Sequence, residues 1–321
     1  MNTRRPDWPA ISPGRFARTI RTDSADGCRV ALLGLPDDLG VRLNNGRPGA
    51  ADGPTAFRAA LASYGTAFDG AAAKPLNIPV FDAGDVIPTE GDNAAALGET
   101  HDRVTAAVAD LHAKGLTTFC IGGGHDLTFP SVRAISQHVN TPIGGVNVDP
   151  HLDVRTNPCS GMPFRAAIDG EFLDPKHFIE LGAGRFSNEH AHFEWLRDQG
   201  ATIILTDDLL AFANAPGEGP MEYAFRAAMP NDNSVGFVSI DLDVIDGSQA
   251  PGVSAVNPCG LPVSLVCEIA RRAGADPRVK HVDVMELSPP NDDASGRTAR
   301  IAALLFLHFI AGFAERESAS G

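Results

Sequence analysis

The chain is poor in several residue types and contains no long hydrophobic run. Its 321 residues include only 2 Trp, 2 Tyr and 5 Cys. No apolar stretch approaches the roughly 20 residues that span a bilayer, so we expect no transmembrane helix. The N-terminal residues MNTRRPDWPAISPGR have no apolar segment behind their basic residues, and this pattern predicts no signal peptide.

Basic residues are also in deficit. The chain has 26 Lys and Arg against 40 Asp and Glu, which gives a formal net charge of −14. Nucleic-acid binding requires a basic face, so we expect no nucleic-acid partner. The same charge disfavours docking on an anionic membrane.

The cysteines form no recognisable framework. Five of them are scattered along the chain without a CxxC pair: Cys28, Cys120, Cys159, Cys259 and Cys267. An odd, dispersed set predicts free thiols in a reducing cytoplasm and argues against a cysteine-rich metal site.

What the chain does have is an alternation of short apolar runs and amphipathic stretches. We expect strands at 29–35, 78–81, 117–121, 143–148, 177–181, 202–205, 235–240 and 280–285, and helices at 54–63, 92–113, 126–137, 188–199, 220–228, 262–273 and 298–313. Most of the strands are continuously apolar, which is typical of parallel strands buried on both faces. The pattern predicts one α/β domain over residues 1–321, with 1–28 as an N-terminal extension and a parallel sheet of about eight strands. A two-domain division is the less favoured alternative.

Carboxylates and imidazoles follow four of these strands. Gly122-Gly123-Gly124-His125-Asp126 follows the third, Asp149-Pro150-His151-Leu152-Asp153 the fourth, Asp241-Leu242-Asp243 the seventh and Glu286 the eighth. In open α/β sheets, binding sites lie at the carboxyl ends of the strands. We therefore expect these side chains to meet at one edge of the sheet.

The spacing of the acidic residues indicates a metal centre. Asp149, His151 and Asp153 alternate, as do Asp241 and Asp243, so each set shares one face of an extended chain. Two such acidic clusters repel each other unless cations neutralise them. Together with His125 they offer four carboxylates and two imidazoles, enough for two metal ions, and this oxygen-rich donor set favours Mn²⁺.

Weaker interpretations exist for each motif taken alone. An Asp at a strand end often caps the following helix. The glycine run before His125 resembles a phosphate-binding loop, but it lacks the GxGxxG and GxxxxGK[ST] spacings and no Lys follows it. The absence of a dinucleotide fingerprint near Gly34 argues against a nucleotide-binding oxidoreductase.

The full motif set resembles the ureohydrolase family of arginases, agmatinases, guanidinobutyrases and formimidoylglutamases. It consists of GGGHDLTFP, NVDPHLDVR, SGMPF, SIDLDVID, APGVSAVNP and MELSPPND, and the resemblance extends from about residue 33 to the last helix. It implies a three-layer α/β/α fold with two Mn²⁺ per chain. By motif, one ion would be held by His125, Asp149, Asp153 and Asp241, and the other by Asp149, His151, Asp241 and Asp243. Glu286 matches the carboxylate that receives the amidine or guanidine end of the substrate.

Two positions depart from the family pattern. Pro150 stands where Ala is usual; it keeps an extended φ but removes one N–H. Ser160 stands where arginases and agmatinases carry a His. Formimidoylglutamases share this Ser-Gly-x-Pro-Phe pattern, as well as segments similar to Gly40–Ala50 and Ala250–Ala255.

Arg155 bears on the substrate. It lies two residues beyond Asp153, where arginases place an Asn that touches the substrate carboxylate, and its guanidinium can pair bidentately with a carboxylate. Alternatively, Arg155 forms a surface or structural salt bridge.

These features predict a hydrolase that cleaves N-formimidoyl-L-glutamate to L-glutamate and formamide, with Asp153 passing a proton to the leaving amine and Ser160 near the substrate. The alternatives are a guanidino-acid amidinohydrolase that releases urea and a non-catalytic metal-binding relative. The family resemblance also implies a homo-oligomer, trimeric or hexameric, with a small amidine or guanidine substrate as the ligand.

Overall fold

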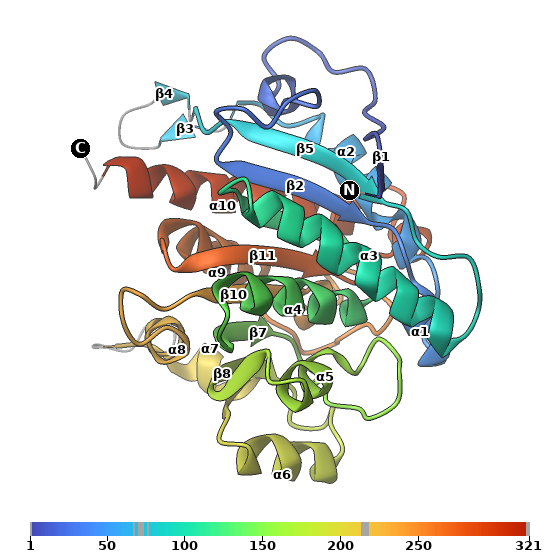
Figure 1. Cartoon of the computed structure of the whole chain (residues 1–321), viewed down its shortest axis with the longest axis vertical. Helices are drawn as coiled ribbons and strands as arrows, with labels where there is room; N and C mark the ends of the chain where they lie inside the picture. Colours follow the sequence, from blue (N-terminus) through green and yellow to red (C-terminus); the bar gives the residue numbers. More distant parts are fainter. Residues whose placement is uncertain (1, 67, 70–73, 76, 213–217, 319–321) are drawn as a thin grey trace.

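A mostly parallel sheet forms the centre of the protein. The computed structural model describes residues 2–66, 68–69, 74–75, 77–212 and 218–318. In the described part, a nine-stranded sheet has the order β1-β5-β2-β6-β11-β10-β7-β8-β9 (Figure 1). Its strands are β1 Thr3–Arg4, β2 Val30–Leu35, β5 Val80–Val86, β6 Thr117–Gly122, β7 Ile143–Val148, β8 Leu173–Ala183, β9 Thr202–Leu205, β10 Gly236–Asp241 and β11 Val279–Met285.

The predicted sheet is confirmed, with one addition. All eight expected strands are present and pair in parallel. The strand that was missed is β1, which pairs antiparallel with β5 at the edge. With only two residues, β1 is too short to show a hydrophobic period. The small β3 Phe68–Asp69 and β4 Lys74–Pro75 hairpin was missed for the same reason.

The prediction for β5 was wrong in its extent. The expected strand ended at Phe81, but β5 continues to Val86 through the residues Asp82-Ala83-Gly84-Asp85. The two aspartates interrupt the apolar run. They are buried because a positively charged side chain faces them, and the residues next to them in the sequence do not reveal this contact.

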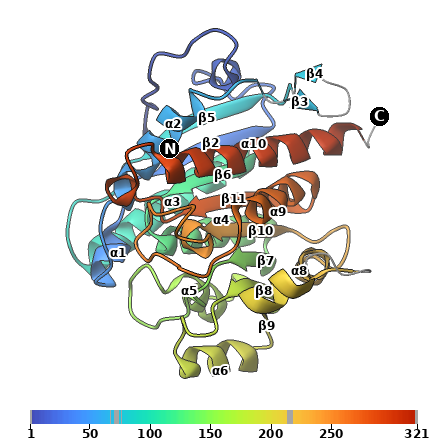
Figure 2. The same cartoon turned by 180° about the vertical axis from the view of Figure 1, so that it is seen from behind.

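Helices cover both faces of the sheet (Figure 2). Their bounds are α1 Leu39–Leu43, α2 Gly53–Leu61, α3 Ala94–His112, α4 Thr128–Val139, α5 Pro163–Asp169, α6 His190–Asp198, α7 Thr206–Phe212, α8 Pro220–Ala228, α9 Val263–Ala275 and α10 Arg297–Ser318. One apolar cluster joins the sheet to α2, α8, α9 and α10, and a second joins its other face to α3, α4 and α5. The fold is the three-layer α/β/α arrangement expected.

Several helix ends differ from expectation. The expected helix at 92–113 begins two residues later, at Ala94, because Asn93 caps α3: its side chain accepts hydrogen bonds from the Ala95 and Ala96 N–H groups. The short helices α1, α5 and α7 were missed, because five to seven residues hold too little periodicity to recognise.

The last helix, α10, is long and apolar enough to cross a bilayer by length and composition. It is nevertheless a core helix, with 61% of its apolar window buried inside the protein. Phe306 lies against Phe57 of α2 and Phe119 of β6 at ring-centroid separations of 5.8 and 4.9 Å. Burial of these aromatics accounts for the apolar character of the helix.

A buried ion cluster fastens α2 to β5. Arg58 of α2 is only 1% exposed. Its guanidinium donates to Asp82 at 2.9 and 3.0 Å and to Asp85 at 2.6 Å. The Trp8 indole N–H also donates to Asp82 at 2.9 Å, so the N-terminal segment is held by the same carboxylate.

We predict that Arg58→Met lowers the free energy of unfolding by about 3–5 kcal/mol, because it removes the buried cation from two buried carboxylates, and only Asp85 keeps a second, exposed cation in Arg4. Urea denaturation followed by circular dichroism measures this loss. The matched control is Arg42→Ala, which removes an exposed pair with Asp38 and should cost no more than about 1 kcal/mol. Equal losses in the two variants would contradict the assigned role of Arg58.

Candidate metal centre and substrate pocket

The sheet order brings four functional strand ends together. The central strands are β6, β11, β10 and β7, in that order, all parallel. Beyond their carboxyl ends lie, respectively, His125, Glu286, the pair Asp241 and Asp243, and the segment that begins at Asp149. The prediction that these side chains meet at one edge of the sheet is confirmed.

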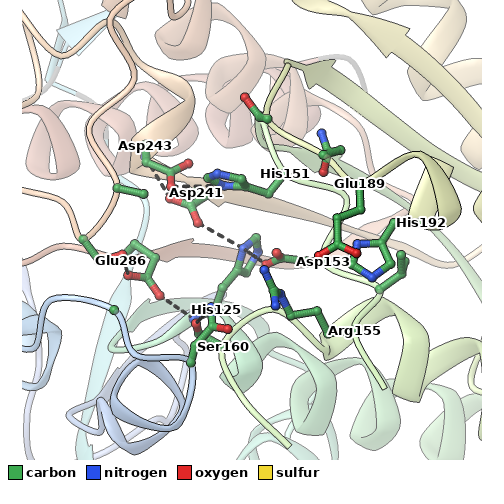
Figure 3. Close-up of a pocket in the computed structure, with 17 residues that line it drawn as sticks. His125, His151, Asp153, Arg155, Ser160, Glu189, His192, Asp241, Asp243 and Glu286 are labelled. Atoms are coloured by element: carbon green, nitrogen blue, oxygen red, sulfur yellow. Dashed lines mark hydrogen bonds and ion pairs between the residues drawn. The ribbon is translucent and has the colours of Figure 1, made fainter. Parts of the chain in front are cut away.

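The first group of potential metal ligands surrounds His125. Its Nδ1 atom lies 3.1 Å from an oxygen of Asp149. It also lies 3.0 Å from an oxygen of Asp153 and 3.1 Å from one of Asp241 (Figure 3). His125, Asp149 and Asp241 are at most 2% exposed. Four side chains from three strand ends therefore converge on one point.

The second group uses the other oxygen of Asp149. The Nδ1 atom of His151 lies 3.3 Å from Asp149 Oδ1 and 3.3 Å from Asp243 Oδ2. Asp149 thus presents Oδ2 to the first group and Oδ1 to the second, which is the arrangement of a bridging carboxylate. For Asp241, one oxygen faces His125 and the other accepts the Asp243 N–H at 2.8 Å.

The donor set fits a pair of divalent cations. His125 Nδ1 and Asp243 Oδ1 are buried without a hydrogen-bond partner within the described residues, and both belong to the cluster. Burial raises the pKa of Asp243 to about 6, although His151 opposes the shift. Burial and the neighbouring Asp243 and Asp149 also raise the pKa of Asp241. Because Asp241 and Asp243 resist ionisation and two ligand atoms are unpaired, the cluster is suited to hold positive charge.

Two carboxylates of the site sit on left-handed backbone. Asp153 has φ 49° and Glu286 has φ 64°. This conformation is uncommon for residues with a Cβ and costs about 1–3 kcal/mol. It turns Glu286 so that one oxygen accepts the His125 N–H at 3.0 Å and the other accepts the Ser254 hydroxyl at 2.6 Å. Burial and the charge of Asp241 raise the pKa of Glu286 to about 8.

A cavity of about 240 Å³ opens onto this cluster. It contains all the predicted site residues except Asp149, which lies beneath it: His125, His151, Asp153, Arg155, Ser160, Asp241, Asp243 and Glu286. Ser160 accepts a hydrogen bond from the Asn44 amide at 3.1 Å and donates its own N–H to the Gly40 carbonyl at 2.9 Å. Thus Ser160 lies at the pocket wall, tied to the loop that carries α1.

Arg155 points into the pocket towards His125 and Asp153 (Figure 3). Gly161 leaves room for it, since a Cβ there would lie 2.9 Å from Arg155 Cδ. Among the described residues the guanidinium has no hydrogen-bond or ion-pair partner, unlike Arg165, which pairs with Asp169. The described residues therefore show no salt bridge for Arg155.

The pocket also contains residues that the sequence analysis did not assign. They are Asn44, Gly46, Val154, Ser187, Asn188, Glu189, His192, Ser254 and Ala255. Glu189 and His192 lie together on the side of the pocket away from Glu286 (Figure 3). Both residues follow β8, and no acidic cluster stands at the end of that strand. Only the rule that sites lie at the carboxyl ends of parallel strands could have indicated this segment from the sequence. The Pro150 carbonyl accepts the Asn188 amide at 2.8 Å and so holds the segment in place.

Comparisons with known proteins agree with this geometry. The arginase family profile matches residues 28–312. The chain is 34% identical to a formimidoylglutamase of Halobacterium salinarum over 95% of this chain and 97% of the relative. It resembles a crystal structure of Trypanosoma cruzi formiminoglutamase with Mn²⁺₂ at a TM-score of 0.85 and 29% identity, covering 97% and 100% of the two chains.

A guanidine-directed relative is also similar. The proclavaminate amidino hydrolase of Streptomyces clavuligerus has a TM-score of 0.81 and 25% identity, over 95% of this chain and 98% of the other. The family match spans nearly the whole sheet and every element that contributes to the carboxylate cluster. The chain therefore belongs to the arginase family.

Proposed function

We propose that the protein hydrolyses N-formimidoyl-L-glutamate to L-glutamate and formamide. The observation that carries this proposal is the guanidinium of Arg155, which has no partner in the described part of the chain and lies in the same pocket as the metal-type cluster. The substrate has an amidine at one end and two carboxylates at the other, so it can engage both features at once. The similarity to formimidoylglutamases over most of the chain supports it.

We further propose that the cluster holds two Mn²⁺ ions. One would be held by His125, Asp149, Asp153 and Asp241, and the other by Asp149, His151, Asp241 and Asp243. When bound, such a pair supplies a hydroxide near neutral pH and stabilises negative charge in the transition state. The Mn²⁺ printed for the Trypanosoma cruzi relative supports this choice of metal.

The remaining chemistry belongs to the side chains. Glu286 would accept the N–H groups of the cationic amidine, with its orientation kept by His125 N–H and Ser254. Asp153 would carry a proton to the leaving amine, which departs as the amino group of glutamate. The left-handed backbone at both residues supports these roles, because it keeps both carboxylates directed into the pocket.

A guanidino-acid amidinohydrolase that releases urea is the second candidate. The similarity to the proclavaminate amidino hydrolase favours it. Ser160 argues against it, because guanidine hydrolases of the family carry a His at this position.

A homo-oligomer and a cytoplasmic location stay predictions.

A substrate panel separates the two candidates. The Mn²⁺-loaded protein should act on N-formimidoyl-L-glutamate with a kcat/KM at least about 100-fold above that on arginine, agmatine or 4-guanidinobutyrate, a barrier difference of about 2.7 kcal/mol. Formamide and urea are assayed separately. A comparable kcat/KM on any of the guanidines would refute the proposed substrate.

Asp241→Ala tests the metal assignment. Removing a shared carboxylate should release at least one Mn²⁺ per chain and abolish nearly all activity, as measured by elemental analysis and formamide release. Chelation of the wild type should lower its Tm, because the buried carboxylates then repel one another. The control Asp207→Ala removes an exposed carboxylate outside the pocket; if it lost as much metal, the site would be misassigned.

Arg155→Ala tests the carboxylate contact. A hydrogen bond to a charged group contributes about 1.5–3 kcal/mol, so kcat/KM should fall about 10- to 100-fold, mostly through KM. Metal content should not change, and Arg155→Lys should recover only part of the loss because an ammonium lacks the bidentate fork. Arg185→Ala, which breaks an exposed pair with Asp207, is the control. Unchanged kinetics in Arg155→Ala would mean that the guanidinium does not touch substrate.

A further inference from the structure

A continuous string of hydrogen bonds runs from His125 into the core. His125 Nε2 lies 2.9 Å from Ser239 Oγ, and Ser239 Oγ lies 2.5 Å from Asp283 Oδ1. The other oxygen of Asp283 lies 2.9 Å from His281 Nε2. His281 Nδ1 in turn lies 2.7 Å from Thr118 Oγ1. Ser239, Asp283, His281 and Thr118 are completely buried, on the three central strands β10, β11 and β6.

The part of the string between His125 and Asp283 is called the near arm here, and the direction of its hydrogen bonds follows from its atoms. A carboxylate only accepts hydrogen bonds, so the Ser239 hydroxyl donates its single hydrogen to Asp283, at an O···O distance of 2.5 Å. The Ser239 oxygen is then only an acceptor towards its remaining neighbours, His125 Nε2 and Thr128 Oγ1, the latter at 3.2 Å. His125 must therefore donate from Nε2, so Nδ1 is the ring nitrogen that faces Asp149, Asp153 and Asp241.

The part of the string beyond Asp283, from His281 to His112, is the far arm, and its hydrogen bonds are also directed towards Asp283. The Thr118 hydroxyl lies 2.7 Å from His281 Nδ1 and 3.2 Å from His112 Nε2, and its other acceptor, the Lys280 carbonyl, is more distant at 3.5 Å. Burial, with His281 and His138 nearby, lowers the pKa of His112 to about 3, so this ring is neutral. His112 can then donate to Thr118, Thr118 to His281, and His281 to Asp283. Every proton in the string is directed at Asp283.

We infer that Asp283 is a positioning residue that acts through Ser239 to hold the Nε2–H of His125, so that the Nδ1 atom is the ring nitrogen aimed at the first metal. The inference rests on the proposed metal ligation by His125. A ligating His commonly has its second N–H held by a carboxylate or carbonyl, and loss of that partner weakens metal affinity about 10- to 100-fold. Here a hydroxyl lies between the carboxylate and the imidazole. The carboxylate determines the direction in which that hydroxyl donates, and so which ring nitrogen of the His must donate to it.

Asp283→Asn should reverse the string with almost no change of shape. The oxygen of the new amide must accept the His281 Nε2–H, so its NH₂ group faces Ser239. Ser239 then accepts from that NH₂ group and donates its own hydrogen to His125 Nε2. That contact favours the opposite tautomer, with the proton on the nitrogen that faces the metal.

Mn²⁺ titration of the full chain, with free Mn²⁺ measured by electron paramagnetic resonance, tests this. In Asp283→Asn we expect one of the two sites to weaken about 10- to 100-fold. Ser239→Ala removes the acceptor without supplying a wrong donor, so its loss should be smaller. The double variant Asp283→Asn/Ser239→Ala should bind Mn²⁺ more tightly than Asp283→Asn alone, because the misdirected hydroxyl is gone.

The recovery in the double variant distinguishes positioning from a structural role, which would give a further loss. The matched buried control is Thr118→Val, which removes only the hydrogen bonds of the far arm. Its Mn²⁺ affinity should stay within about threefold of the wild type, because Asp283 and Ser239 remain. Unchanged affinity in Asp283→Asn, or no recovery in the double variant, would overturn the inference. If Asp283→Asn fails to fold by circular dichroism, unchanged affinity in Ser239→Ala would overturn it instead. A wild type that binds no Mn²⁺ would refute the proposed metal centre itself.

Discussion

Repulsion between buried carboxylates is the constraint on which this active site depends. Asp149, Asp241 and Asp243 are each at most 2% exposed, and their oxygens approach shared imidazole nitrogens at 3.1–3.3 Å. Such a group is costly to ionise in a low-dielectric setting, and bound cations relieve the cost. Metal binding, stability of the strand ends and positioning of the ligands are therefore one coupled property.

The parallel sheet makes this arrangement possible. Parallel strands end at the same edge, so the acidic residues at the ends of three strands and His125 after a fourth are brought to one place without long connecting loops. The same packing directs the strands' apolar residues into the two layers of helices. Elsewhere the protein neutralises buried acids with its own cations, as Arg58 does for Asp82 and Asp85. Among the described residues no Arg or Lys pairs in this way with the strand-end carboxylates, and this difference marks their cluster as a metal site.

The core beneath the site is polar where a parallel sheet is ordinarily apolar. Asp283 and His281 occupy the central strand β11 and are 0% exposed, yet their hydrogen bonds to Ser239 and Thr118 are complete. A fully paired network of this kind is rigid, because breaking any one contact leaves a buried group unsatisfied. It joins the orientation of His125 to strands on either side of β11, so the ligand geometry is maintained by the core as well as by the pocket wall.

Local chemistry determined what could be predicted from sequence. Continuous apolar runs identified eight of the nine strands of the sheet, and residues such as His125, Asp149 and Asp241 were recognised because each lies at or just beyond the end of a strand. Tertiary structure decided which of those ends are neighbours: β11 and β10, late in the chain, insert between β6 and β7. It also decided that Arg155 faces the pocket, that Glu189 and His192 join it, and that Asp283 meets Ser239. These features depend on pairing between distant segments, whose energies come from packing across the sheet and leave no periodic trace in the residues on either side.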